Sequence, residues 1–370
     1  MTNRKIRVGV ILGGKSAEHE VSLNSAQNVM RALDKNKYEV VPIGISKDGQ
    51  WLLRGDPLKA LTSGQTSMPQ LLESGYRIVD DLSTGREVIP GSQAAGLPDV
   101  DVIFPVLHGP FGEDGTVQGL LELADIPYVG AGVLASAVGM DKAAMKDVFR
   151  SHGLPVPNYI VINRRDWETG PDAVGHRVAN EIGYPCFVKP ANMGSSVGVS
   201  KVHVASELTV AMNDAAQYDR KLLVEYAVPS AREIECSVLG NDQPVASVPG
   251  EVVPGHEFYD YVAKYIDDSS DLLIPAPIDP AVADRVRELS IKAFVAVDCA
   301  GMARVDFLLS RDTGELFISE LNTIPGFTRI SMYPKLWEAS GIGYSELIDR
   351  LIQLALERHA DKHRVHTSRE

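Results

Sequence analysis

The sequence predicts a mixed α/β and α+β protein, in which a doubly wound N-terminal α/β domain precedes two smaller units of strands and helices. Apolar strand patterns alternate with a helix and glycine-rich loops in residues 1–138, which is typical of doubly wound sheets. Loop signals then separate residues 139–230 from residues 231–370. The last unit contains a β-hairpin with polar side chains on one face.

In the N-terminal domain, apolar runs predict strands at 5–12, 39–45 and 100–106. A Gly-Ser loop is expected over 13–22, followed by a helix at 23–33 with apolar residues on one side. The third strand leads into a glycine-dense loop that contains His108, and α/β proteins place ligands at such strand ends. An imidazole that caps a turn is an equally good interpretation of His108.

The central unit is predicted to begin with a helix that ends at Gly153 and to continue with a helix at 171–183. Strands are expected at 186–190 and 221–228, and a Gly-Ser loop over 191–200 follows the first of them. Backbone N–H groups of such a loop can close over phosphates, although flexible hairpin loops have the same composition.

The C-terminal unit is predicted to contain a strand at 233–239 and helices at 279–297 and 343–359. Residues 250–276 show no clear period. A loop of that length in a compact domain is usually a lid or a binding loop, so we expect a lid here.

Composition excludes several classes of protein. The chain has 370 residues, 44% of them hydrophobic, and a net charge of -13, which disfavours binding to nucleic acid or an anionic membrane. The cysteines, Cys186, Cys236 and Cys299, show no metal-ligand spacing and are expected to be small buried residues. The apolar run at 8–12 is too short for a signal peptide. We therefore expect a cytoplasmic protein.

The stretch 301–334 is predicted to form a β-hairpin that carries polar side chains two residues apart. Arg304 and Asp306 share a face of one strand, as Glu320 and Asn322 do on the next. Their oxygen atoms suit Mg²⁺ that bridges phosphates. A half-exposed hairpin in which Arg304 pairs with a carboxylate is the alternative.

Residues 9–16 match the P-loop pattern G-x-x-x-x-G-K-[ST] letter for letter. Gly9 falls inside a predicted strand, however, and the three apolar residues after it would have to line a phosphate cradle instead of pairing in a sheet. A P-loop NTPase that uses Lys15 is therefore kept only as an alternative from another class.

The order of a strand lysine before a Gly-Ser loop, a Val-Glu strand, an Arg-x-Asp strand and a Glu-x-Asn strand resembles the ATP-grasp superfamily. Over nearly the whole chain, shorter motifs resemble the D-alanine–D-alanine ligase family. These motifs are GGKSAEHEVS (13–22), HG (108–109), EDG (113–115), GSSVG (194–198), ELNT (320–323) and PGFT (325–328).

The resemblance implies an N-terminal substrate-binding domain followed by a two-subdomain ATP-grasp fold with a lid at about 250–276. It implies ATP-dependent joining of two D-alanines to D-alanyl-D-alanine through an acyl phosphate, for peptidoglycan precursor synthesis. ADP and phosphate are released. ATP, two Mg²⁺ (or Mn²⁺) ions and a homodimer are implied as well.

The resemblance also implies roles for single residues. ATP would contact Lys142, Lys189, Glu225, Tyr226, Ala227, Val228, Glu233 and Lys264. The metal ligands would be Asp306, Glu320 and Asn322. Substrate would contact Glu18, His108, Arg304, Ser331 and Met332. The catalytic group would comprise Glu18, Ser195 and Tyr265, linked by hydrogen bonds, with Arg304 and the Gly326 N–H at the oxyanion. A helix-dipole acid is the alternative for Glu18.

Two alternatives lie within the same fold. Relatives that make D-alanyl-D-lactate are similar but use a histidine in the lid, and His256 lies in that stretch. Lys264-Tyr265 nevertheless stands where the dipeptide-forming pattern has it, which favours D-alanine as second substrate. Another carboxylate–amine ligase is the remaining alternative.

Overall fold

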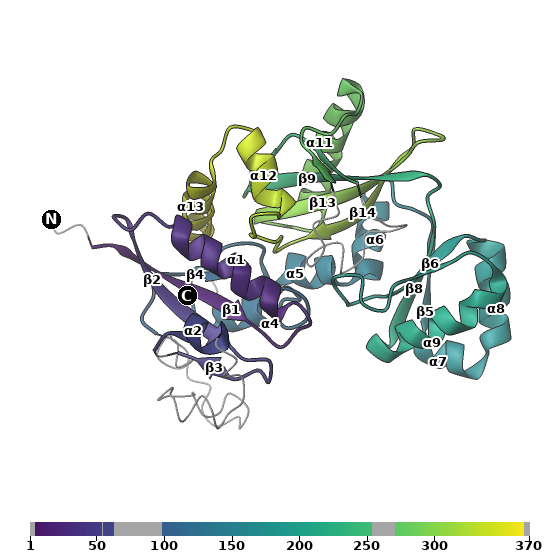
Figure 1. Ribbon diagram of the computed structural model, residues 1–370, viewed down its shortest axis with the longest axis horizontal. Coiled ribbons are helices and arrows are strands. Elements are labelled where there is room, and N and C mark those ends of the chain that lie inside the picture. Colours follow the sequence, from purple (N-terminus) through teal and green to yellow (C-terminus); the bar gives the residue numbers. More distant parts are fainter. Residues whose placement is uncertain (1–3, 54, 63–97, 254–270, 366–370) are drawn as a thin grey trace.

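The chain folds into three β-sheets, and the computed structural model describes residues 4–53, 55–62, 98–253 and 271–365. Figure 1 shows the first and second sheets toward opposite ends of the molecule, with the third between them. None of the helices in the described ranges is both long and apolar enough to cross a membrane.

The first sheet has the strand order β3-β2-β1-β4, and β1 pairs in parallel with both β2 and β4. Its strands are β1 (Ile6–Gly13), β2 (Tyr38–Ile45), β3 (Trp51–Leu52) and β4 (Val102–Pro105). The helices around it are α1 (His19–Ala32), α2 (Pro57–Thr62), α4 (Thr116–Leu123) and α13 (Tyr344–Lys362). Val10 and Leu12 pack with α1 and α13, whereas Ile11 packs with α4. Both faces are therefore covered, which confirms the predicted doubly wound arrangement.

The predicted Gly-Ser loop over 13–22 is shorter than expected, because α1 begins at His19. Side chains of the helix hold the end of β1: the Ser22 hydroxyl accepts the Gly13 N–H at 2.8 Å, and His19 Nδ1 lies 2.8 Å from the Gly14 carbonyl oxygen. Glu18 consequently stands at the N-terminal end of a helix.

The second sheet, of order β5-β8-β6-β7, is antiparallel throughout. Its strands are β5 (Tyr159–Asn163), β6 (Cys186–Pro190), β7 (Ser200–Val202) and β8 (Lys221–Tyr226). Its helices are α7 (Arg164–Thr169), α8 (Pro171–Glu181), the 3₁₀ turn η1 (Ala205–Glu207) and α9 (Leu208–Tyr218). Val188 and Val224 pack into the core with these helices. Because side chains alternate along a strand, Lys189 and Glu225 project from the opposite face.

The third sheet is antiparallel and has the order β12-β11-β9-β13-β14, with β10 beside β9. Its strands are β9 (Ala231–Gly240), β10 (Val245–Ala246), β11 (Gly250–Val253), β12 (Asp271–Leu273), β13 (Gly301–Ser310) and β14 (Leu316–Asn322). The remaining helices are α5 (Val133–Met140), α6 (Lys142–Ser151), α11 (Pro280–Ala296) and α12 (Met332–Ala339).

One face of the third sheet is apolar and the other polar. Phe149 of α6 and Phe294 of α11 pack with the β13 residues Val305 and Phe307. Burial alternates along β13, so Arg304 and Asp306 lie on the face turned away from that core. The hairpin predicted within 301–334 is confirmed, because β13 and β14 pair antiparallel.

The prediction that 250–276 lacks secondary structure is wrong at both ends of the stretch. Strands β11 and β12 pair antiparallel there, from Glu251 opposite Leu273 to Val253 opposite Asp271. Runs of three or four residues are too short to show a period in the sequence. Residues 254–270 of the predicted lid, which include His256, Lys264 and Tyr265, lie outside the described residues.

Candidate active site

Side chains from all three sheet units line one cleft, with a cavity volume of about 230 Å³. The predicted site residues that line it are Glu18, His108, Lys142, Lys189, Ser195, Glu225, Glu233, Arg304, Asp306, Glu320, Asn322, Gly326, Ser331 and Met332. Tyr226, Ala227 and Val228 are not among the lining residues. Lys264 and Tyr265 fall outside the described ranges.

The floor of the cleft is a row of carboxylates across three strands. Glu235 of β9 is opposite Asp306 of β13, which is opposite Glu320 of β14. The Arg304 guanidinium binds both Asp306 oxygens at 2.7 Å and lies 2.9 Å from Glu235. The Asn322 amide donates to Asp306 at 2.9 Å. The four hairpin side chains therefore meet on one face, as their spacing predicts, whereas Glu235 joins them through a strand register that a sequence pattern does not reveal.

The oxygen atoms of this row suit a hard divalent cation. Like charges directly opposite one another destabilise a sheet, so the three carboxylates need positive charge nearby. Arg304 forms the salt bridge that the alternative interpretation of the hairpin expects. Mg²⁺ is usually held by one or two carboxylates together with phosphate oxygens and water, and Asp306, Glu320 and Asn322 provide such donors along the cleft. The residues present therefore fit Mg²⁺ or Mn²⁺.

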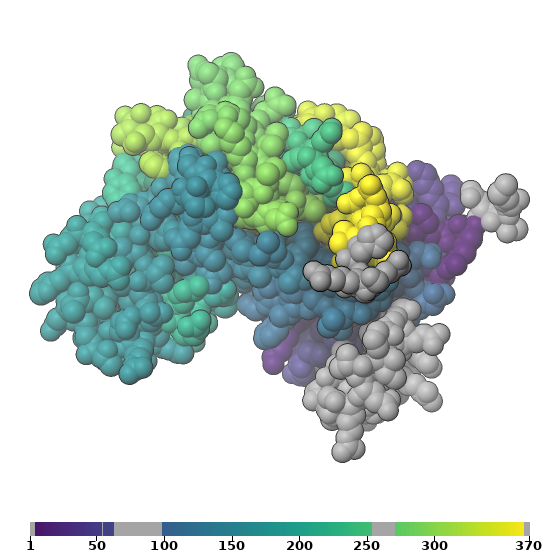
Figure 2. Space-filling view, turned by 180° about the vertical axis from the view of Figure 1, so that it is seen from behind, coloured from purple at the N-terminus to yellow at the C-terminus, as the bar shows by residue number. Residues whose placement is uncertain are grey.

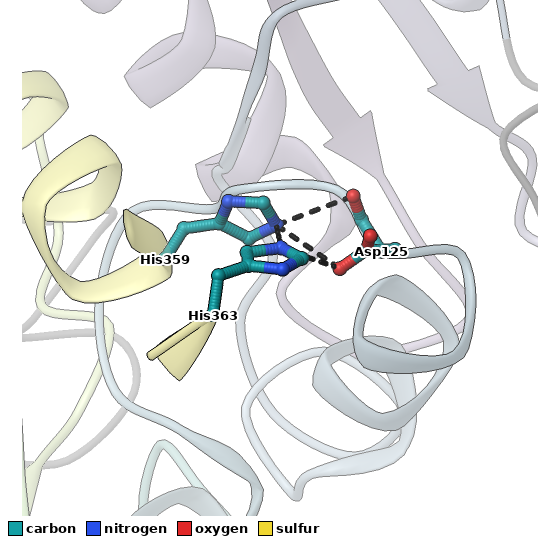
Figure 3. A group of neighbouring side chains, drawn as sticks. All are labelled: Asp125, His359 and His363. Carbon is teal, nitrogen blue, oxygen red and sulfur yellow. Dashed lines mark hydrogen bonds and ion pairs between the residues drawn. The ribbon is translucent and has the colours of Figure 1, made fainter. Parts of the chain in front are cut away.

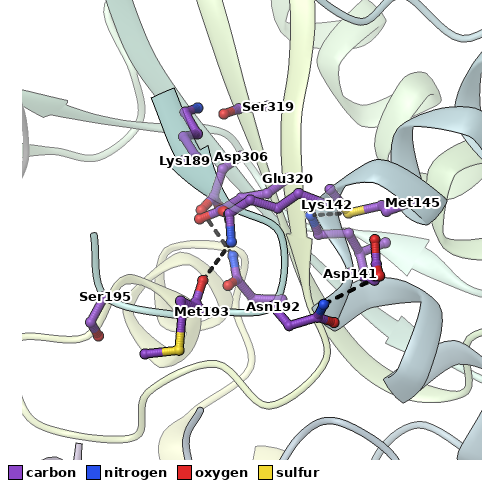
Figure 4. A network of polar contacts seen from close by, with 12 residues as sticks. Asp141, Lys142, Met145, Lys189, Asn192, Met193, Ser195, Asp306, Ser319 and Glu320 are labelled. Atoms are coloured by element: carbon purple, nitrogen blue, oxygen red, sulfur yellow. Dashed lines mark hydrogen bonds and ion pairs between the residues drawn. The ribbon is translucent and has the colours of Figure 1, made fainter. Parts of the chain in front are cut away.

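Two lysines face the carboxylate row from other elements. Lys142, at the start of α6, lies 4.0 Å from Glu320 and donates to the Met193 carbonyl at 2.6 Å (Figure 4). Lys189 projects from β6, with its Nζ 3.0 Å from Glu225. Ammonium groups opposite carboxylates are the arrangement that holds a polyphosphate bridged by a divalent cation.

Glu225 is buried between two lysines. Its side chain and that of Lys146 are each 1% exposed and 2.7 Å apart. Burial alone would raise the pKa of Glu225, but Lys146 and Lys189 hold the pKa below its ordinary value. Burial lowers the pKa of Lys146. Burial would also lower the pKa of Lys189, but the attraction of Glu225, Glu320 and Glu233 together outweighs burial and raises it. Lys146 was not predicted as a site residue, because lysines on helices are mostly exposed.

The segment after Glu225 is already hydrogen-bonded to its own unit. The Tyr226 N–H donates to the Asn158 carbonyl at 2.8 Å, and the Ala227 N–H donates to the Pro185 carbonyl at 3.2 Å. The Tyr226 and Ala227 N–H groups therefore already donate to carbonyl oxygens of the protein in this structure.

At the other end of the cleft, backbone segments converge on the Glu18 carboxylate. The Ser195 hydroxyl donates to Glu18. A Cβ atom added at Gly109 or Gly194 would lie 2.7 or 2.9 Å from Glu18 Oε2, so a side chain at either position would displace the Glu18 carboxylate. Ser195 and Ser196 have φ angles of 50° and 58°, a left-handed conformation that costs roughly 1–2 kcal/mol per residue outside glycine. The loop thus bears local strain while it presents Ser195 to Glu18.

His108 and Glu113 are uncharged neighbours of Glu18. His108 Nδ1 lies 3.1 Å from the Ile324 carbonyl, to which it donates, so Nε2 is a bare acceptor, and it has no hydrogen-bond partner among the described residues. Burial lowers the pKa of His108, which agrees with a neutral ring. Burial, reinforced by the charge of Glu18, raises the pKa of Glu113 to about 8. Glu113 belongs to the EDG motif at 113–115, but the motif alone assigns it no role.

Gly326 and Ser331 close the cleft beside α12. The Ser331 hydroxyl accepts the Thr328 N–H at 3.0 Å. A Cβ atom on Gly326 would lie 2.6 Å from that hydroxyl oxygen, so a side chain at this position would displace the Ser331 hydroxyl. Met332 follows as the first residue of α12.

The P-loop interpretation of residues 9–16 is wrong. Gly9 lies within β1, where it pairs with Val41 and Ile103, and the three apolar residues after it are buried. Lys15 lines a different hollow, with Trp51 and Phe111 among its neighbours.

Known proteins resemble this chain along nearly its whole length. The models for the D-Ala–D-Ala ligase N-terminus and C-terminus match residues 7–131 and 148–353. A D-alanine–D-alanine ligase of Heliobacterium modesticaldum is 54% identical over 366 residues, covering 99% of this chain and 98% of that protein. The structure of the D-alanine–D-alanine ligase from Coxiella burnetii has a TM-score of 0.82 at 37% identity and covers 97% of this chain and 96% of its own. The structure of the VanG D-Ala:D-Ser ligase from Enterococcus faecalis has a TM-score of 0.81 at 35% identity, and the match covers 95% of this chain and 100% of that one.

Proposed function

The chain belongs to the D-alanine–D-alanine ligase family, and from this premise we propose that it joins two D-alanines in an ATP-dependent reaction that releases ADP and phosphate. The observation that carries the proposal is the position of the Arg304–Asp306 pair in a cleft lined both by Lys142 and Lys189 and by Glu18. Such a cleft can bring a polyphosphate and an amino acid together. The product would serve peptidoglycan precursor synthesis in the cytoplasm.

The domains and the nucleotide site are part of this proposal. Residues 1–138 would bind substrate, and residues 139–230 and 231–370 would clasp ATP. Lys142, Lys189 and Lys264 would bind phosphates, Glu233 the ribose, and the segment Glu225, Tyr226, Ala227 and Val228 the adenine. Asp306, Glu320 and Asn322 would hold two Mg²⁺ or Mn²⁺ ions, which draw charge from the phosphates when bound.

The chain's own residues would position both substrates. Glu18 would bind the ammonium group of the first D-alanine, with the bare Nε2 of His108 beside it and Ser195 and Tyr265 joining the same hydrogen-bond network. The γ-phosphoryl group of ATP moves to the carboxylate of this D-alanine, which gives an acyl phosphate and ADP.

The second D-alanine would be held through its carboxylate by Ser331 and the Met332 backbone. Its amine attacks the acyl carbon, forms the C–N bond and loses a proton, and phosphate leaves with the electrons of the C–O bond. Arg304 and the Gly326 N–H would stabilise the tetrahedral oxyanion between these steps, a role in which one donor contributes about 2.7–4 kcal/mol.

We expect ADP release that depends on D-alanine, with a product of the mass of D-alanyl-D-alanine. Lys189→Ala should abolish ATP turnover, because it removes a phosphate-facing cation, whereas Lys15→Ala should retain it. A coupled ADP assay and mass spectrometry of the product measure both. ATP turnover that ignores D-alanine would contradict the proposal, and a loss of turnover in Lys15→Ala alone would contradict the assignment of the nucleotide site.

D-Serine is a second candidate for the second substrate, because the chain is similar to a D-Ala:D-Ser ligase structure. Equimolar D-alanine, D-serine and D-lactate in one assay at neutral pH distinguish the products by mass. We propose D-alanine as the preferred acceptor and a homodimer as the assembly, which light scattering tests.

Binding of the first D-alanine should release a proton near pH 7. The pKa of Glu113 is raised to about 8, so this carboxyl is protonated at pH 7, and a substrate ammonium placed beside it favours the carboxylate. Titration calorimetry with a non-hydrolysable ATP analogue present, in two buffers of different ionisation enthalpy, measures the release. Proton release should decrease above pH 8 and should be absent in Glu113→Gln. Equal heats in both buffers for the unmodified protein would contradict it.

A further inference from the structure

A cluster of two histidines and one aspartate lies away from the cleft, where the end of α13 meets the turn after α4 (Figure 3). His359 lies in α13 and His363 caps the C-terminal end of that helix four positions later, so their rings share one side of it. Asp125 follows α4 and lies 234 positions before His359 along the chain. Among the described residues, this is the one group of His, Cys, Asp and Glu side chains whose ligand atoms all lie within 4.8 Å of one another.

The three ligand atoms form a nearly equilateral triangle. Asp125 Oδ1 lies 3.2 Å from His359 Nε2 and 3.1 Å from His363 Nε2, and the two nitrogens are 3.3 Å apart. In a tetrahedral site with metal–ligand bonds of about 2.0–2.1 Å, neighbouring ligand atoms stand about 3.3 Å apart. The cluster therefore already has the dimensions of one face of such a site, and the fourth position is left for water.

The surroundings hold the two halves of the cluster in place. Arg358 donates to the carbonyl oxygens of Tyr128 and Gly130, and Lys362 is ion-paired with Glu122. Figure 2 shows this end of α13 in yellow against the blue surface of the N-terminal half. A cation at this place would also face the C-terminal end of a helix, where the helix dipole favours positive charge.

The solvent exposure of the three side chains and their ligand types both suit a metal ion. The side chains of His359, His363 and Asp125 are 24%, 52% and 59% exposed, so an ion reaches them from solvent. Two imidazoles with one carboxylate suit Zn²⁺, Co²⁺ or Ni²⁺ better than Mg²⁺. The described cysteines are buried, and burial raises the pKa of Cys299 to about 12, so its thiol does not compete.

We propose that Asp125, His359 and His363 bind a divalent transition-metal ion, most readily Zn²⁺, which fastens the C-terminal helix to the N-terminal domain. The alternative is a hydrogen-bonded group in which both Nε2 atoms carry a proton toward the same carboxylate oxygen. The site is separate from the carboxylate row in the cleft and does not depend on the proposed function.

Titration of the full chain, without a polyhistidine tag, with Co²⁺ in excess Mg²⁺ tests the site. Tetrahedral Co²⁺ absorbs visible light much more strongly than octahedral Co²⁺ in an oxygen site, so absorption separates this cluster from the cleft. We expect one strongly absorbing Co²⁺ per chain, displaced by Zn²⁺, and a melting temperature that rises with Zn²⁺.

Three variants sharpen the result. His363→Gln and Asp125→Asn should each weaken Zn²⁺ binding by at least about tenfold, the smallest effect usual for perturbing a metal site. Asparagine tolerates the φ of 55° at position 125, so this variant keeps the turn. His176→Gln, at an exposed histidine of α8, should bind as the unmodified chain does. No tetrahedral Co²⁺ in the unmodified chain, or equal binding in His363→Gln, would overturn the proposal.

Discussion

Replacing Arg304 with methionine should lower kcat of the ligation by about 100- to 1,000-fold, the usual effect of removing one donor to a developing oxyanion. Arg304 binds both oxygens of Asp306 and also contacts Glu235. Without it, the carboxylate row loses the guanidinium that holds Asp306 in place. Steady-state kinetics for ATP and D-alanine, measured separately, give the size of the effect.

The conservative change Arg304→Lys separates charge from geometry. Lysine keeps the positive charge but cannot make two parallel hydrogen bonds to one carboxylate, so most of the loss in kcat should remain. ATP affinity, measured by calorimetry without D-alanine, should change far less than kcat if Arg304 acts on the oxyanion. A loss of ATP affinity equal to the loss of kcat/KM would assign Arg304 to nucleotide binding instead.

Arg232 offers a matched control in the same sheet. It is paired with Glu251 through two hydrogen bonds, at 2.8 and 2.6 Å, and it does not line the cleft. Arg232→Met removes the same kind of bidentate pair and should leave kcat close to that of the unmodified chain. Equal losses of kcat in Arg232→Met and Arg304→Met would show that the effect comes from weakening the sheet.

The parts of the fold that depend on local pattern can be predicted from the sequence. The hairpin of β13 and β14 is predictable because polar residues recur at a period of two. Helix α6 is predictable because Asp141 caps it, accepting the N–H groups of Ala143 and Ala144. The P-loop pattern was a false match. The apolar residues around Gly9 are buried in β1, so this segment is a strand although its sequence fits the motif.

Features that depend on packing between distant segments are not predictable in this way. The place of Glu235 in the cleft follows from the register of β9 against β13. Helix α13 packs on the first sheet although it is the last helix of the chain. The short strands β11 and β12 form because each has the other as a partner. In each case the pattern of the segment does not identify the distant segment that it packs against.

Replacing Lys146 with methionine should lower the free energy of unfolding by about 3–5 kcal/mol, the usual cost of breaking a buried ion pair from one side. Lys146 and Glu225 are both 1% exposed. Methionine fills a similar volume, so the loss comes mainly from a buried carboxylate that keeps Lys189 but loses Lys146 as an ion-pair partner. Urea denaturation at pH 7 measures it.

Lys292→Met is the matched control, because Lys292 also pairs with a glutamate, Glu288, but both side chains are about half exposed. Exposed helix ion pairs contribute little to stability, so this variant should unfold almost as the unmodified chain does. A similar, small loss in both lysine variants would contradict the buried ion pair.

Glu225 and its two lysine partners, Lys146 and Lys189, link stability to nucleotide binding. Glu225→Gln removes the carboxylate that binds both lysines, so Lys189 loses the 3.0 Å contact that fixes its ammonium group at the cleft. ATP affinity should therefore fall in Glu225→Gln in addition to stability.

Because Lys146 and Glu225 contact each other, the double variant Lys146→Met/Glu225→Gln should lose less free energy of unfolding than the sum of the two single changes. The pKa of Glu225 is held below its ordinary value, so its stabilising effect is present at neutral pH and is lost as the pH falls through that lowered pKa. If the costs of the two single changes at pH 7 were strictly additive, the two side chains would act independently. That result would contradict the ion pair, in which the two groups are buried and 2.7 Å apart.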